Sequence, residues 1–400
     1  MNALLTWFTQ PGPPLSGMPF TRFPVVHRFW GTGLLALLLG FGLGIVMWIA
    51  RDGGWGHQLP FDLLREHHAQ LQAVYFTGTF ILGFALQAGP HVIGAQPLPT
   101  ARLLWLPPLL WAGFLLSTTP WPILPLLGNA LSSAAFLLAG WGLLTQARTS
   151  PPERRWFIGY PLAAGVAFFA VGPWLPLEQP AIALAFLLSG PVAVVLAVGQ
   201  HLIANILGGQ RLDPQQRGVF VGMLGGGLLS AWVSAAGWWT WEGTGAIWLA
   251  LAGFTAWGTK LYPAMRRTIQ DPAALAVGLA MAALLAALLW LALGGISAVD
   301  GVVHWIGIDC LTLVILAVAA RVSSFFTGAY ALSHPLLRGV LLLTFAAGAW
   351  RGLASTGLLP LALTPWVGGI LAALLLIWAW GVGGRLLAIG AKAKASGVKP

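Results

Sequence analysis

The chain has 400 residues, of which 58% are hydrophobic and only 8% are charged, and its net charge is +10. Its mean hydropathy is +0.82. A soluble domain cannot bury so much apolar surface, so the composition excludes a soluble protein and predicts a polytopic membrane protein. Basic loops orient membrane helices and attract anionic lipid, so the positive charge indicates a lipid bilayer as partner and no nucleic acid.

Apolar stretches long enough to cross a hydrocarbon core of ~30 Å as helices follow one another along the chain. They predict an all-α integral membrane bundle over residues 30–388, between an N-terminal cytoplasmic segment (1–29) and a basic cytoplasmic tail (389–400). About twelve spans are expected, at 30–50, 68–90, 102–118, 122–145, 156–176, 179–207, 218–239, 244–264, 273–296, 302–320, 336–356 and 363–384.

The positive charges indicate the orientation of these spans. With twelve spans, seventeen of the twenty Lys and Arg fall on the side of the N-terminus, and only Arg51, Arg65 and Arg351 fall on the other. The positive-inside rule then places both termini in the cytoplasm. The expected location of the chain is a bacterial inner membrane. The single cysteine, Cys310, excludes an internal disulfide.

The predicted second span carries a row of polar residues. His68, Gln72, Tyr75 and Thr79 are spaced 4, 3 and 4 residues apart, which predicts that they share one face of an α-helix. Polar side chains in an apolar span face the bundle interior or a cavity. A haem edge, a proton path and a hydrogen-bonded seam between helices would each account for the row.

The predicted sixth and tenth spans hold the other candidate ligands. A neutral imidazole is the usual ligand of haem iron and also suits copper, which makes His68, His201 and His304 candidate metal ligands. Gly307, one turn after His304, would leave room for a flat ring against the backbone. A metal held by His201 would need ligands from other helices.

Asp309 is the one carboxylate that the predicted spans place well inside the hydrocarbon. An acid at this depth is a candidate proton relay, together with Thr79, and a salt bridge to a neighbouring helix is the alternative. In a regular α-helix Asp309 would lie ~140° around the axis from His304, so the spacing predicts that it serves a second site.

The second, sixth and tenth predicted spans end alike. Each closes with a polar or basic residue followed by a glycine, at Gly94, Gly208 and Gly328. The spacing of four spans indicates three related four-helix units.

Two of these segments resemble the NnrS family, membrane proteins associated with the response to nitric oxide. His68–Gln72 and Phe80–Leu86 are similar to the family's His-Ala-His-x-Gln motif and the helix after it. His304, Ala317–Val322 and Phe326–Gly328 are similar to its histidine-led helix, and Val198–Ile203 is similar more loosely to a third stretch.

The resemblance implies about twelve helices, haem and copper, and a distant likeness to the catalytic subunit of haem-copper oxidases. In that wider fold the histidine ligands come from helices 2, 6, 7 and 10, and His68, His201 and His304 occupy three of these. Gln70 stands where the family has a second histidine, and His201 replaces a family arginine. The predicted seventh span has no histidine, so haem b is expected rather than a three-histidine copper site.

These observations favour a b-type haem protein that binds or responds to nitric oxide, or transfers electrons, with the iron held by His68 and His304. Nitric oxide and a respiratory electron donor are then the expected partners. If the protein is an enzyme, we expect an oxidoreductase acting on nitric oxide or a related small oxidant. The alternatives are a small-solute transporter or channel that lacks a cofactor, and an anchor subunit of a respiratory complex.

Overall fold

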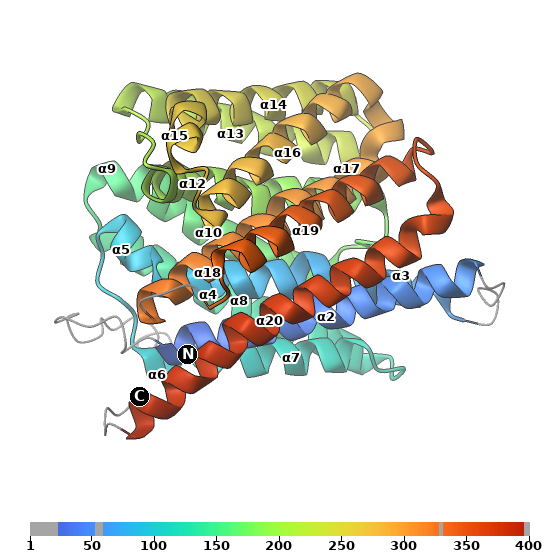
Figure 1. Cartoon of the computed structure of the whole chain (residues 1–400), viewed down its shortest axis with the longest axis horizontal. Coiled ribbons are helices and arrows are strands. Elements are labelled where there is room, and N and C mark those ends of the chain that lie inside the picture. The colour runs from blue at the N-terminus through green and yellow to red at the C-terminus, as the bar shows by residue number, and fades with distance from the viewer. Residues whose placement is uncertain (1–22, 53–58, 328–330, 396–400) are drawn as a thin grey trace. The chain divides into compact units, whose positions relative to one another are not determined.

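Helices form every described element of the computed structural model, which covers residues 23–52, 59–327 and 331–395 (Figure 1). No strand occurs within those ranges, so the all-α prediction is confirmed for them. Most of the predicted N-terminal segment (1–29) and the last residues of the predicted tail (389–400) lie outside the described residues.

The helices follow the apolar runs of the sequence, and prolines often mark where they begin. Pro152, Pro180, Pro214 and Pro272 each stand at the start of a helix, where the missing N–H of proline costs no hydrogen bond. In chain order the elements are α2 (Phe23–Asp52), α3 (Phe61–Gln70), η3 (Leu71–Phe76), α4 (Thr77–Gln87), α5 (Gly89–Ile93), α6 (Thr100–Leu103), α7 (Leu106–Ser117), α8 (Ile123–Thr149), α9 (Pro152–Arg154), η4 (Arg155–Gly159), α10 (Tyr160–Phe168), η5 (Phe169–Trp174), α11 (Pro180–Leu187), η6 (Leu188–Val192), α12 (Ala193–Leu207), α13 (Pro214–Ala235), α14 (Trp241–Gly258), α15 (Leu261–Thr268), α16 (Pro272–Gly294), η7 (Gly295–Ala298), α17 (Val299–Trp305), η8 (Ile306–Thr312), α18 (Leu313–Thr327), α19 (His334–Ser355), η9 (Leu361–Leu363) and α20 (Thr364–Ala395).

Nine helical stretches of the described residues are long and apolar enough to cross a membrane. The chain is therefore a polytopic membrane protein. One stretch, Pro272–Val322, contains two of the predicted spans, while α7 and α14 are helices outside the nine. The count of twelve spans and the cytoplasmic position of both termini stay predictions.

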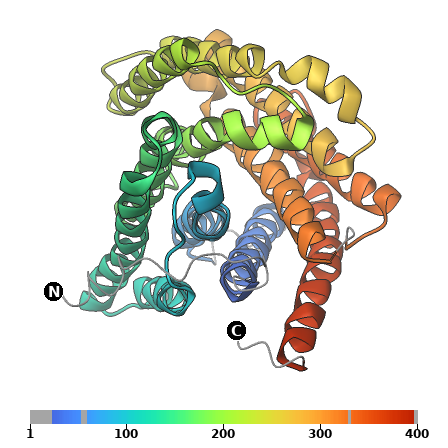
Figure 2. The ribbon, with the colours of Figure 1, turned by 90° about the vertical axis from the view of Figure 1, so that its left-hand side faces the viewer.

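The chain divides into two compact units. The first consists of residues 1–36, 74–175 and 385–400. Its centre is α8, against which both α7 and α10 pack (Figure 2). Glycine allows the closest of these approaches, because a Cβ at Gly128 would lie 2.5 Å from the carbonyl oxygen of Gly113.

The second unit consists of residues 37–73 and 176–384. Its central helix is α16, a nearly all-apolar helix that packs against α14, α18 and α19, while α17 packs along α19. The first turn of α16 is closed by Asp271, whose Oδ1 accepts a hydrogen bond from the backbone N–H of Ala274 at 3.0 Å. Its Oδ2 meets the Arg321 guanidinium at 3.1 Å.

Replacing Asp271 with Ala is expected to lower the free energy of unfolding by about 1 kcal/mol, because the α16 cap and the ion pair with Arg321 are lost together. Asp271→Asn keeps a cap oxygen and loses only the charge, so it should fall between Ala and the wild type. Thermal unfolding in detergent measures both variants. Equal stability of Asp271→Ala and the wild type would contradict the role of the cap.

Four helical runs of the described residues contain a π turn. The runs that begin at Phe61, Pro152, Pro180 and Val299 contain η3, η4, η6 and η8, respectively, before α-helix resumes. Two of these runs end on the left-handed glycines Gly94 and Gly208, and Gly328 lies outside the described residues. Because the run from Pro152 belongs to the predicted fifth span, the π turns do not single out the second, sixth and tenth spans, and the three related units stay a prediction.

Candidate functional site

His68 lies near the C-terminal end of α3, with its ring against α2. Its Nδ1 is 2.7 Å from the carbonyl oxygen of Gly40, and a Cβ at Gly44 would lie 3.1 Å from its Cε1. Gly44 thus lets the imidazole approach the helix backbone, and Gly40 does the same for the Gln72 amide, with which a Cβ there would collide. If Nδ1 donates to the Gly40 carbonyl, Nε2 carries a lone pair, and it has no hydrogen-bond partner among the described residues. A backbone carbonyl that fixes the tautomer in this way orients a histidine as a metal ligand.

His304 lies near the end of α17, and both of its ring nitrogens have partners. Nδ1 is 2.8 Å from the carbonyl oxygen of Asp300, one turn earlier, and Nε2 is 3.1 Å from a terminal nitrogen of Arg351 on α19. A guanidinium can only donate, so Nε2 accepts and Nδ1 carries the proton. His304 is therefore held as a neutral imidazole whose lone pair is directed at Arg351.

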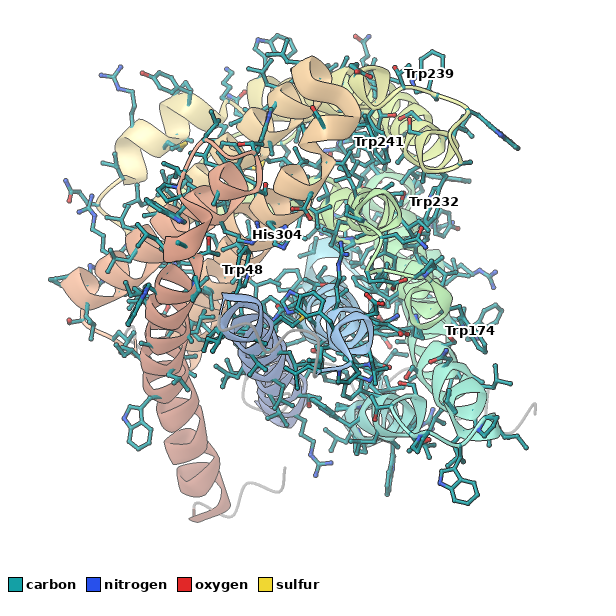
Figure 3. All side chains as sticks on the ribbon, turned by 90° about the vertical axis from the view of Figure 1, so that its right-hand side faces the viewer. Trp48, Trp174, Trp232, Trp239, Trp241 and His304 are labelled. Atoms are coloured by element: carbon teal, nitrogen blue, oxygen red, sulfur yellow. The ribbon has the colours of Figure 1, made fainter. Side chains whose placement is uncertain are left out.

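Arg351 is the residue that connects this part of the second unit. Its guanidinium lies 3.8 Å from the Asp300 carboxylate and 5.5 Å from the centre of the Trp48 ring on α2. Figure 3 shows Trp48 and His304 on neighbouring helices. Residues from α2, α17 and α19 thus meet around one cation.

Sequence reasoning missed Arg351, because the positive-inside count treated it as a loop charge. It lies inside α19, four residues before the helix ends, and its side chain is only 17% exposed. An arginine that is largely buried within a membrane span needs partners for its charge. The position of Arg351 inside the predicted span 336–356 was therefore the feature of the sequence that could have identified it.

The other predicted residues of the second span form hydrogen bonds with different helices. The Gln72 amide donates to the carbonyl oxygen of Leu37 on α2 at 3.0 Å, next to His68. In the first unit, the Tyr75 hydroxyl is 2.8 Å from the Ser132 hydroxyl on α8, and Thr79 donates to the carbonyl oxygen of Tyr75 in its own helix. The π turn η3 contains Gln72 and Tyr75 and shifts the register within the row, so Gln72 contacts α2 while Tyr75 contacts α8.

Asp309 is fully buried in the π turn η8. Its carboxyl group lies directly against Gly348 of α19, where a Cβ would collide with Oδ1. Neither oxygen forms a hydrogen bond of normal geometry with the described residues. Asp309 and His304 both contact α19, through Gly348 and Arg351 respectively, and the assignment of Asp309 to a second site stays a prediction. A π turn takes about one residue more than an α turn, so it carries Asp309 back toward the side of His304.

Gly307 and His201 were the remaining predicted site residues. A Cβ at Gly307 would meet nothing within 4 Å, which leaves open space one turn beyond His304. His201 is buried in α12. No cluster of three or more His, Cys, Asp or Glu that could hold a metal ion occurs in the part of the chain that the structure describes. The described residues thus contain no cluster of three ligands for copper, while imidazole is a usual ligand of haem iron.

A family model described as NnrS protein matches residues 28–389, which is nearly the whole chain. The match includes every candidate residue discussed above. The chain has no match among curated proteins.

Proposed function

Because the chain belongs to the NnrS family, and this membership suggests a role in the nitric oxide response, we propose that it is an inner-membrane b-type haem protein that binds nitric oxide. The observation that carries the proposal is the pair of neutral imidazoles in the second unit. The Nδ1 of His68 lies on the Gly40 carbonyl of α2, which leaves Nε2 without a partner among the described residues. Arg351 joins His304 to Trp48 of the same helix α2. Open space at Gly307 adds room on the His304 side.

The two histidines have different tasks in this proposal. His68 would hold the iron through Nε2, because its Nδ1 is fixed on the Gly40 carbonyl. The lone pair of His304 is engaged by Arg351, so His304 would become a second ligand only after that hydrogen bond breaks. The bound haem would supply an iron that binds a diatomic gas or accepts an electron. Arg351 would thus keep His304 from binding the iron and leave the iron open to a small ligand.

The first test is the visible spectrum of the detergent-purified protein, reduced minus oxidised, with haem and copper quantified in the same sample. We expect a b-type α band at about one haem per chain. Added nitric oxide should change the spectrum of the reduced protein, because Arg351 would hold His304 away from the iron. Expression in cells supplied with a haem precursor excludes a shortage of haem as the reason for a missing band.

Two results would contradict the proposal. A well-folded, haem-supplied protein without a haem band would favour the transporter, with the polar residues of the second span along its pathway. A haem band that nitric oxide leaves unchanged would indicate two bound histidines and an electron-transfer protein.

A further inference from the structure

A groove with two basic side chains lies in the second unit, away from the histidine pair. Its volume is about 450 Å³, and it forms where the loop between α12 and α13 meets the turn between α14 and α15. The backbone N–H of Gln210 donates to the carbonyl oxygen of Thr259 at 2.9 Å, which ties the two segments together. Leu212 packs from the loop onto Gly258, where a Cβ would collide with it. The groove is thus a built feature of these two connections.

The charge of the groove is positive. Arg211 and Lys260 line it, both are exposed, and neither forms an ion pair with a described residue. Asp213 is the only acidic residue in the lining, and its carboxylate is occupied by the capping box of α13, where Oδ1 accepts from the backbone N–H of Gln216 at 2.8 Å. Arg266, whose guanidinium lies over the Tyr262 ring, adds positive charge nearby.

Aromatic side chains form the rim of the groove. Trp257 and Tyr262 are each 70% exposed. Both residues lie near the end of the predicted span 244–264, and exposed Trp and Tyr at such a place are typical of the boundary between head groups and acyl chains. On the prediction of twelve spans, the groove opens at the depth of the lipid phosphates on the cytoplasmic side.

We propose that this groove binds the head group of an anionic phospholipid, with Arg211 and Lys260 on its phosphate and Trp257 and Tyr262 beside its acyl chains. Basic pockets between helices on the cytoplasmic side of a membrane are suited to anionic head groups. The guanidinium of Arg211 is a good donor to phosphate oxygens, while Lys260 supplies a point charge. The aromatic rim distinguishes a lipid from a free phosphate ion, which would gain nothing from it.

The test is native mass spectrometry of the delipidated full-length protein, titrated with phosphatidylglycerol and with phosphatidylcholine of the same acyl chains. We expect phosphatidylglycerol to bind at least about tenfold more tightly, and Arg211→Gln combined with Lys260→Asn to remove that preference. Asn is chosen at position 260 because Lys260 has a left-handed backbone (φ 51°), which Asn tolerates.

Arg148→Gln combined with Arg154→Gln removes the same charge from another predicted cytoplasmic loop and should leave the preference unchanged. Equal loss in both double variants would show a general charge effect and overturn the proposal. Inorganic phosphate that displaces the lipid completely at millimolar concentration would assign the groove to a soluble phosphate and would also overturn it. Gel filtration confirms that each variant is folded, and the result does not depend on haem.

Discussion

His68→Ala is expected to reduce the haem content of the purified protein to less than about a tenth of the wild-type value, because His68 supplies the unoccupied imidazole nitrogen of the site. The lone pair of His304 is engaged by Arg351, so His304 cannot fully replace it. Haem per chain, measured as the pyridine complex, gives the result. His91→Ala changes an exposed histidine of the first unit and should keep all of the haem.

Arg351→Gln tests the proposed role of Arg351, which is to keep His304 from binding the haem iron. Without the guanidinium, Nε2 of His304 is released and becomes available as a second ligand. The spectrum of the oxidised variant should therefore shift toward that of a low-spin, two-histidine haem. The shift should be absent when His304→Ala is added. Full haem retention by His68→Ala would contradict the assignment of the ligand, and an unshifted Arg351→Gln spectrum would contradict the role of Arg351.

The helices could be predicted from the sequence because each depends on a property of a whole segment. A run of about 20 apolar residues must satisfy its backbone hydrogen bonds internally in lipid, which leaves a helix as the available structure. The caps of α13 and α16, Asp213 and Asp271 just before a proline, were not used in the prediction, and the predicted span 218–239 begins later than α13 does. His68 and His304 were found because polar residues are rare in such segments.

The arrangement around these histidines could not be predicted, because it depends on π turns and on contacts between helices distant in sequence. A π turn adds one residue to a helical turn without a compositional signal, so η3 and η8 shifted the predicted faces of their spans. The contacts of His68 with Gly40 and of His304 with Arg351 join residues 28 and 47 positions apart. Only the packing of α2 on α3 and of α17 on α19 brings them together.

Gly348→Ala is expected to be the most destabilising of the conservative changes at this site. The added Cβ would collide with the Asp309 carboxyl group and lie 2.7 Å from Cγ2 of Ile308. Overpacking in a close-packed interior costs about 1–3 kcal/mol, and α19 cannot move away without breaking the contact between Arg351 and His304. Thermal unfolding in detergent should show the loss. Gly339→Ala, on the same helix, meets nothing within 4 Å and should be neutral or slightly stabilising.

The decisive comparison adds Asp309→Ala to Gly348→Ala. Removing the carboxyl group vacates the space that the new methyl group needs, so the double variant should be more stable than Gly348→Ala alone. In a regular α-helix Asp309 would point ~140° away from His304 and thus away from α19, and the two substitutions would then simply add. Additive effects would therefore contradict the π turn η8 and return Asp309 to a separate site. Suppression would establish that one face of α19 meets both His304 and Asp309.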